Sequence, residues 1–330
     1  MLEYILGYKG ASNFKADIGT TVHKILEVMA IAKKAKQDGK RIFTDDVCGK
    51  LSTTKYDLDE VTNKVYDHYA AMWPHHPWTD GTRKDVHKLV NMAITCQDGA
   101  FNPANRVIVE PEQRFDITID EPWAKYEYDI PGEGKISGNL ALKGTIDLIT
   151  EVSPGIIEII DWKTGARKNW TTGEEKTYEK LCADPQLMLY YYAARKLYPK
   201  AEQIILTIFF IKDGGPFTIC FSDDDLEIME KLIREKFNKI KATRTPKLSK
   251  TWKCKKLCTF GKNSFETLPI AGIKPIIEFR PGQATKRGDA MTCCAQVEFE
   301  LARKGMEKVT AEYKNPEHTI GMYHAPGGGI

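Results

Sequence analysis

Apolar residues recur at steps of three and four along residues 17–37, which is the spacing of an amphipathic helix. A less regular version of the same period covers residues 58–72 and 85–96. An aromatic and proline-rich loop at residues 73–78 separates these two segments. The pattern therefore predicts that the first hundred residues are mostly helical.

After residue 105 the pattern changes to β-branched runs in which apolar and polar positions alternate, as is typical of half-buried strands. Turn signals at residues 131–134 and 153–155 separate these runs. We interpret the region as an antiparallel meander. Its four expected strands cover residues 106–117, 123–130, 140–151 and 155–163.

Helical and strand patterns alternate in the next part of the chain. Residues 184–197 and 223–242 have helical periodicity, and an apolar run at 203–211 and a shorter strand at 217–221 lie between them. A further helix is expected at residues 292–308. The order of these elements predicts the α/β class, with a central mixed, mostly antiparallel sheet flanked by helices.

These patterns divide the chain into three expected parts. Residues 1–105 form a helical N-terminal part, residues 106–242 form the core that contains the sheet, and residues 243–330 form a basic, cysteine-bearing C-terminal segment. We see no internal repeat and no long low-complexity linker in the sequence.

Composition and charge narrow the class of protein. Apolar residues make up 42% and charged residues 28% of the 330 residues, which excludes disordered and collagen-like chains. The longest apolar stretch, residues 204–211, is too short to cross a bilayer, and the N-terminus lacks a signal-peptide pattern. We therefore expect a soluble, cytoplasmic protein with no membrane partner. Because the net charge is only +3, any sign of a nucleic-acid partner must be local.

The residues that suggest chemistry lie on two neighbouring expected strands. Residues two apart in a strand share a face, so Asp161 and Lys163 project together while Trp162 points the other way. If the strands pair through the turn at residues 153–155, Asp147 comes close to Asp161. Two carboxylates at the end of an apolar sheet suit Mg²⁺ or Mn²⁺. Such an ion would activate water for phosphodiester hydrolysis, and Lys163 would orient that water or stabilise the developing charge.

The arrangement Asp147…Asp161-Trp-Lys163 resembles the motif of the PD-(D/E)xK nuclease superfamily. An isolated Asp-x-Lys is often only an exposed charge pair. The segment Gly19-Thr-Thr-Val-His23-Lys-Ile-Leu-Glu27, however, resembles the first motif of the RecB/Cas4-like (AddB-like) branch, in which the histidine contributes to the metal site. The resemblance therefore implies a restriction-endonuclease-like core and assigns His23, Asp147 and Asp161 as metal ligands.

A third segment, Asp184-Pro-Gln186-Leu-Met-Leu-Tyr190, is similar to the Gln-x-x-x-Tyr motif of the same branch. A spacing of four places Gln186 and Tyr190 on one face of a helix, where they would hold a DNA phosphate, a base or the catalytic lysine. The order of all these motifs along residues 17–198 carries the resemblance. It implies a catalytic set of Asp147, Asp161, Lys163, Gln186 and Tyr190.

One more segment, Val107-Ile-Val-Glu110-Pro-Glu112, resembles the strand that precedes the first aspartate in this branch. Glu110 and Glu112 are two apart, so alternation places them on one strand face. We interpret them as a solvent-facing pair rather than as a further set of metal ligands.

Candidate DNA contacts lie after the catalytic motif and beyond the core. Residues 239–256 contain eight Lys or Arg residues and no acidic residue, which suits either a solvated face or phosphate binding. The candidates are Arg167, Lys168, Lys247, Lys250 and Lys253. Three tryptophans could stack on unpaired bases, with core packing as the alternative use. They are Trp73, Trp78 and Trp170.

The segment Trp252-Lys-Cys254-Lys-Lys-Leu-Cys258 resembles the cysteine-bearing segment of Cas4-like and AddB-like proteins. In those proteins, three such cysteines and one from the start of the chain hold a [4Fe–4S] cluster. This sequence departs from that pattern, because no cysteine precedes His23 and the nearest third cysteine is Cys293 or Cys294. A missing N-terminal piece would explain the first departure.

Zinc is the alternative ligand for these cysteines. Cys254, Cys258 and one or both of Cys293 and Cys294 would hold Zn²⁺, which takes four N or S ligands in a structural site. The other cysteines lie in apolar patterns, and we expect them to be buried thiols. They are Cys48, Cys96, Cys182 and Cys220.

Together these motifs predict a metal-dependent DNA nuclease, an exonuclease rather than an endonuclease, that acts in recombination, repair or phage DNA processing. The resemblance implies DNA as partner, with a helicase, recombinase or single-strand-binding protein delivering it, and the host cytoplasm as location if a phage encodes the chain. Two alternatives remain open. One is a catalytically inactive DNA-binding or assembly subunit with the same fold, and the other is a structural zinc or iron–sulfur protein.

Overall fold

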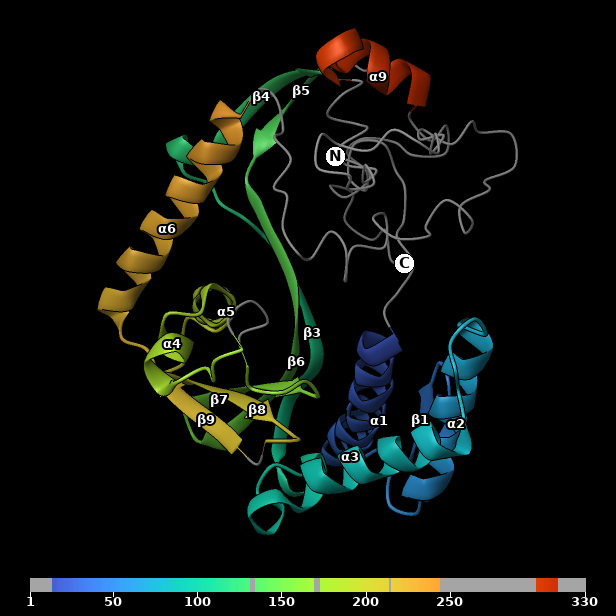
Figure 1. Ribbon diagram of the computed structural model, residues 1–330. Coiled ribbons are helices and arrows are strands. Elements are labelled where there is room, and N and C mark those ends of the chain that lie inside the picture. Colours follow the sequence, from blue (N-terminus) through green and yellow to red (C-terminus); the bar gives the residue numbers. More distant parts are fainter. Residues whose placement is uncertain (1–13, 131–133, 169–172, 214, 244–300, 314–330) are drawn as a thin grey trace. The chain divides into compact units, whose positions relative to one another are not determined.

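The computed structural model describes residues 14–130, 134–168, 173–213, 215–243 and 301–313 (Figure 1). The chain divides into two compact units. The first, which we call the sheet unit, lies within residues 13–119 and 141–233. The second, the hairpin unit, contains residues 120–140 and the described residues after 233.

A five-stranded sheet organises the sheet unit, with strand order β3-β6-β7-β8-β9. All neighbouring strands are antiparallel except β7 and β8, which are parallel. The predicted mixed, mostly antiparallel sheet is therefore confirmed. Its strands are β3 (Val107–Thr118), β6 (Ala141–Ser153), β7 (Ile156–Lys163), β8 (Gln203–Phe210) and β9 (Gly215–Cys220).

The predicted meander is wrong in one respect. β4 (Lys125–Ile130) and β5 (Gly134–Asn139) form their own two-stranded sheet in the hairpin unit, and β4 follows a 3-10 turn at Pro122–Ala124. β3 pairs directly with β6, from Val107↔Glu151 to Thr118↔Ala141. The chain thus leaves the main sheet after β3 and returns to it at β6, which alternation within single strands does not reveal.

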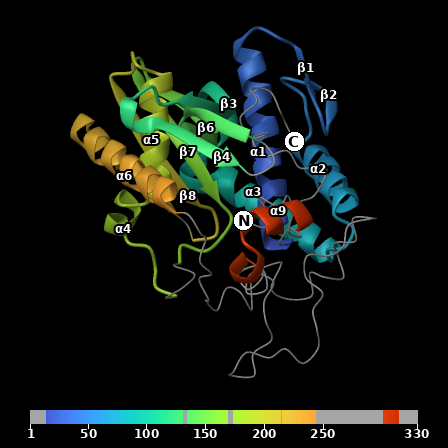
Figure 2. The ribbon, with the colours of Figure 1, turned by 90° about the horizontal axis from the view of Figure 1, so that it is seen from above.

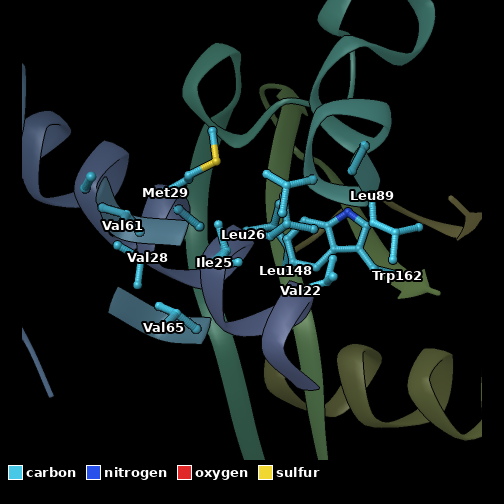
Figure 3. Close-up of a cluster of buried hydrophobic side chains, with 14 of the residues drawn as sticks. Val22, Ile25, Leu26, Val28, Met29, Val61, Val65, Leu89, Leu148 and Trp162 are labelled. Carbon is cyan, nitrogen blue, oxygen red and sulfur yellow. The ribbon is translucent and has the colours of Figure 1, made fainter. Parts of the chain in front are cut away.

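Helix α1 (Phe14–Gln37) lies against one face of the sheet, and two further helices, α2 (Leu58–Met72) and α3 (Asp80–Gly99), pack against α1. The helices expected over residues 17–37 and 58–72 are therefore confirmed. The apolar stripe of α1 is fully buried at Val22, Ile25 and Leu26. Figure 3 shows this stripe against Leu148 and Trp162 of the sheet, in one cluster. Burial of such a stripe, rather than local propensity, stabilises a helix of this kind.

Two features of this helical region differ from the expectation. α3 begins at Asp80, before residue 85, because Thr79 and Thr82 form a reciprocal capping box, and its backbone leaves helical geometry at Cys96. A short hairpin, β1 (Ile42–Asp45) and β2 (Gly49–Ser52), was not predicted. Strands of four residues are too short to show a period.

Helix α5 (Pro185–Leu197), preceded by the short α4 (Tyr178–Cys182), covers the opposite face (Figure 2). Leu187, Tyr191 and Ala194 of α5 lie in a second buried cluster with Ile159 and Ile208 of the sheet. The sheet is thus buried on both faces, as expected for a strand order that includes a parallel pair.

The remaining named helices are α6 and α9. α6 (Asp223–Ala242) has the bounds that its periodicity predicts. α9 (Met306–Tyr313) belongs to the hairpin unit. Of the helix expected at 292–308, residues 301–304 are helical, Gly305 interrupts the helix before α9, and residues 292–300 lie outside the described residues. Within the parts of the chain that the structure describes, no helix is long and apolar enough to span a membrane.

Candidate active site

The candidate site lies where β6 and β7 separate. The two strands pair from Ser153↔Ile156 to Leu148↔Ile160, and Asp147 and Asp161 occupy the next position on each strand. Here the ladder is replaced by a side-chain contact, because the Trp162 backbone N–H donates to Asp147 Oδ2 at 2.8 Å. The expected pairing through the turn at residues 153–155 is therefore present, and it brings the two aspartates to adjacent positions.

On its other side, Asp147 faces Glu112 of β3. The pairs Pro111↔Leu148 and Gln113↔Ile146 flank these two residues, so Glu112 and Asp147 are opposite each other. Glu112 has a φ of 47°, in the left-handed region that residues with side chains rarely adopt. Three acidic residues thus occupy one row across three adjacent strands.

The expectation that Glu110 and Glu112 share a solvent-facing strand surface is wrong. Glu110 pairs with Ile149, which belongs to the cluster beneath α5, whereas Glu112 meets a histidine from α1. A register shift lies between Ile108 and Glu110, and the positive φ at Glu112 then breaks the alternation between Glu110 and Glu112. Glu112 is therefore a site residue that the sequence pattern missed, although the resemblance had pointed to its segment.

α1 contributes His23 to the row. His23 Nδ1 lies 3.4 Å from Asp147 Oδ1, and its ring meets Trp162 edge-on with centroids 6.2 Å apart. One ligand atom from each of His23, Glu112 and Asp147 lies within 4.8 Å of the other two. Because Oδ2 of Asp147 accepts from the Trp162 amide, Oδ1 is the oxygen left for an ion. An imidazole nitrogen and two carboxylate oxygens form a donor set that fits a divalent cation.

The pKa values reflect the gathering of negative charge. Burial raises the pKa of Glu112 to about 7, and the charges of Asp147 and Glu27 add to this shift. Burial alone would lower the pKa of His23, but the charge and hydrogen bond of Asp147 and the charge of Asp161 raise it overall. Carboxylates that repel one another in a half-buried site are stabilised by a cation.

Asp161 and Lys163 project together from β7, as alternation predicts, while Trp162 is fully buried on the other side. Lys163 Nζ lies 2.6 Å from Asp161 Oδ2, and the side chains are 31% and 3% exposed, respectively. Burial raises the pKa of Asp161 to about 6, with Lys163 lowering it and Asp147 raising it. Asp161 thus forms an ion pair with the ammonium group of Lys163, whereas Glu112 lies with His23 and Asp147 in the group of candidate metal ligands.

The Gln-x-x-x-Tyr segment forms the start of α5. Asp184 caps the helix by accepting from the Gln186 backbone N–H, and Gln186 Nε2 donates to Tyr190 Oη at 2.9 Å. Burial, followed by the charge of Asp161, raises the pKa of Tyr190 to about 12. The buried phenol therefore lies near Asp161, and the exposed Gln186 lies on its solvent side.

The sequence matches the model of the PD-(D/E)XK nuclease superfamily over residues 1–262. The protein belongs to this superfamily. No characterised protein matches the chain significantly in sequence. Its five-stranded sheet between helices is the restriction-endonuclease-like fold expected of a PD-(D/E)XK protein, and membership implies a nuclease that hydrolyses phosphodiester bonds.

The two expected DNA contacts near the PD-(D/E)XK motif differ in accessibility. The Arg167 guanidinium donates to the Lys176 carbonyl at 2.8 Å and to Glu175 at 3.0 Å, and lies 4.7 Å above the Phe217 ring. The Arg167 side chain is therefore occupied by contacts with Glu175, Lys176 and Phe217 within the protein. Lys168 is exposed. Lys247, Lys250 and Lys253 lie outside the described residues.

The tryptophans near α2 are used for packing. Trp73 stacks on Tyr69 with centroids 4.9 Å apart, and Trp78 packs against the α1-side cluster and donates to the Trp73 carbonyl at 2.9 Å. Trp170 lies outside the described residues.

The expectation of four buried thiols holds only for Cys48. Cys96 and Cys182 are half-buried, and Cys220 is exposed. On β9, Ile219 points into the core, so alternation turns the neighbouring Cys220 outward. The candidate cluster or zinc ligands Cys254, Cys258, Cys293 and Cys294 lie outside the described residues.

Proposed function

We propose that this PD-(D/E)XK protein is a cation-dependent DNA exonuclease of the RecB/Cas4-like branch. The observation that carries the proposal is the convergence of four elements at the fork between β6 and β7. α1, β3, β6 and β7 contribute an imidazole, three carboxylates and an ammonium group to one place.

His23, Glu112 and Asp147 are the proposed ligands of Mg²⁺ or Mn²⁺, with Asp161 at the edge of the site. When bound, the ion supplies Lewis acidity, which polarises a phosphate oxygen and lowers the pKa of water. The Trp162 amide fixes the Asp147 carboxylate by binding one of its oxygens. The ligand is therefore oriented before any ion arrives, as preorganised sites require.

Lys163 is the proposed catalytic cation. Asp161 anchors its ammonium group at 2.6 Å from one side, and the lysine side chain is 31% exposed, so its remaining N–H groups can reach a substrate. From there, the ammonium orients the attacking water and stabilises the charge that develops on the phosphate. The exposed Gln186, held by Tyr190, is the proposed group that orients the DNA strand.

The test is cleavage of end-labelled linear single-stranded, linear duplex and closed circular DNA, with Mn²⁺, Mg²⁺ or EDTA. Lys163→Ala should lower the cleavage rate at least about a hundredfold, the scale on which preorganised charge contributes to catalysis. Lys143→Ala is the matched control, because Lys143 is also a strand lysine bound to an aspartate, at 2.7 Å from Asp116. It should cleave at the wild-type rate.

The outcomes separate the possible activities. Cation-dependent loss of linear DNA alone supports an exonuclease, whereas cutting of circles would make the protein an endonuclease. Undiminished cleavage by Lys163→Ala would contradict the role of this lysine. Absence of cleavage in folded wild-type protein would favour a DNA-binding subunit without turnover.

We further propose that Cys254 and Cys258, with Cys293 or Cys294, bind a [4Fe–4S] cluster or Zn²⁺. Elemental analysis for iron and zinc, before and after substitution of both Cys254 and Cys258 by Ser, tests this site. A nuclease with these features would act in recombination, repair or phage DNA processing, alongside a helicase, recombinase or single-strand-binding protein. Co-purification of one of these partners would support that role.

A further inference from the structure

A basic groove lies between the end of α1 and the β1–β2 hairpin, on the sheet unit. Its volume is about 680 Å³. Four cationic side chains line it, together with the hydroxyl groups of Ser52 and Thr54, and none of its described lining residues is acidic. The cationic residues are Lys36, Lys40, Arg41 and Lys55. Figure 2 shows the hairpin beside α1.

Local structure fixes the backbone of the groove. Gly39 has a φ of 75°, and the backbone N–H of Lys40 donates to the Ala35 carbonyl at 2.9 Å, so the chain turns sharply at the end of α1. Thr53 fixes the backbone of Lys40 and Arg41. Its hydroxyl donates to the Lys40 carbonyl at 2.9 Å, and its N–H donates to the Arg41 carbonyl at 3.0 Å. The backbone that carries Lys40 and Arg41 is thus fixed by hydrogen bonds.

The four cations of the basic groove are unneutralised. All four are exposed, and none forms an ion pair with a residue that the structure describes. Three acidic residues near the groove form ion pairs with lysines outside it. Asp38 binds Lys34 at 3.3 Å, and Asp45 and Asp46 bind Lys24 at 2.9 and 2.7 Å. A cluster of like charges with hydroxyl donors and no internal counter-ion favours an extended polyanion.

We propose that the basic groove binds the phosphate backbone of DNA at a distance from the catalytic centre. Lys36 follows His23 by thirteen residues on the same helix, which corresponds to about 20 Å along the axis. At about 3.4 Å per base pair, this is roughly six base pairs from the bond that is cut. The inference rests on the proposed function only in taking DNA as the ligand.

The first experiment measures binding of a labelled 30-base-pair duplex by variants that also carry Lys163→Ala, without divalent cation. Lys40→Gln/Arg41→Gln removes two charges from the groove. Its matched control, Lys84→Gln/Lys88→Gln, removes two exposed charges from α3, where Asp80 and Asp85 lie close by in sequence. The groove variant should bind about tenfold more weakly, and the slope of log affinity against log salt should fall by about 2.

The control pair should change affinity by less than about twofold. An equal loss in both variants, or an unchanged salt slope in the groove variant, would overturn the proposal. Because the assay needs no cleavage, a protein that binds through the groove but never cuts DNA would contradict the proposed function alone.

The second experiment compares substrate lengths with Lys163 intact. The groove variant should lose kcat/KM on a 30-base-pair duplex, about tenfold, but retain wild-type kcat/KM on a single-stranded dinucleotide, which is too short to span the distance of about 20 Å to the groove. Equal losses on both substrates would show that the two cations act at the catalytic centre or on the fold, and the proposal would fail.

Discussion

Glu112 combines an unfavourable backbone conformation with an unfavourable electrostatic position. A φ of 47° in a non-glycine residue costs on the order of 1–3 kcal/mol, and its carboxyl group faces Asp147. Both costs would be offset by a cation shared with His23 and Asp147. Strain located beside a cluster of ligand atoms is therefore a structural argument for a metal-binding role.

Glu112→Gln is the first prediction at this scale. The amide keeps the shape of the side chain but removes its charge, so the Mn²⁺ concentration for half-maximal cleavage should rise at least about tenfold. Glu110→Gln is the control, because Glu110 is on the same strand but lies beside Ile149, away from the site. Equal effects of the two substitutions on Mn²⁺ dependence would exclude Glu112 as a ligand.

The second prediction concerns pH. The folded-state pKa values of Glu112 and Asp161 are raised to about 7 and 6, so the native protein binds more protons than the unfolded chain between these values and the ordinary pKa values near 4. The raised pKa of His23 acts in the same direction. Without metal, these groups therefore add stability as the pH falls from about 8 to 5 and remove it as the pH rises.

Thermal unfolding at a series of pH values checks this sign. Relative to Glu112→Gln, the metal-free wild-type protein should lose a few degrees of Tm between pH 5 and pH 8, since 1 kcal/mol corresponds to about 2–4 °C in a domain of the size of the sheet unit. The stabilisation by added Mn²⁺ should increase over the same interval, because deprotonated ligands bind cations better. A pH-independent Mn²⁺ effect would contradict the assignment.

At the scale of elements, the approach of α1 to the end of β7 positions the site. A Cβ atom on Gly19 would lie 2.9 Å from Thr164 Oγ1, and no other atom of the described residues outside α1 would come within 4 Å of it. Thr164 directly follows Lys163. The glycine of the Gly-Thr-x-x-His segment thus allows the helix that carries His23 to pack beside the strand that carries Lys163.

Gly19→Ala should consequently lower cleavage about tenfold and destabilise the fold by about 1–3 kcal/mol, because overpacking displaces one element from the other. Adding Thr164→Ala should restore most of the loss, since it removes the single contacting atom. Gly81→Ala, in α3 with only an ordinary contact at 3.5 Å, is the control for a helical glycine. A double variant as impaired as Gly19→Ala would refute this packing explanation.

Periodicity predicted the long elements well. The helices at Leu58–Met72 and Asp223–Ala242 have the expected bounds, because long amphipathic faces give repeated evidence of one period. The excursion of β4 and β5 from the sheet was not predictable, since pairing partners depend on contacts across the chain rather than on alternation within a strand.

The residues of the candidate site likewise differ in whether a local sequence pattern could predict their positions. The shared face of Asp161 and Lys163 follows from strand geometry alone. His23 could be assigned only through the resemblance, because its contact with Asp147 spans more than a hundred residues. Glu112 was wrongly interpreted because the register shift before Glu110 and the positive φ of Glu112 interrupt the alternation on which the prediction depended.

At the scale of the whole molecule, the proposed Mg²⁺ or Mn²⁺ ligands and Lys163 all belong to the sheet unit. Cation binding should therefore slow amide hydrogen exchange in that unit, most at α1, β6 and β7, by mass action on the native state. The β4–β5 hairpin should exchange at its metal-free rate. Hydrogen exchange with and without Mn²⁺ checks this, with Glu112→Gln as the variant that should show no change.

Uniform protection across both units would contradict a site confined to the sheet unit. Protection that persists in Glu112→Gln would indicate that the ion binds elsewhere in the chain.

The position of β7 between β6 and β8 has a consequence for synthesis of the protein. A growing chain contains the whole Asp161-Trp-Lys163 segment some forty residues before it contains β8, which pairs with β7 along its full length. Until then β7 is an exposed edge, and the row of acids has no stable frame. A ribosome-bound fragment that ends before Gln203 would therefore contain His23, Glu112, Asp147 and Asp161 but lack the strand that holds β7 in place, and we expect it not to cleave DNA.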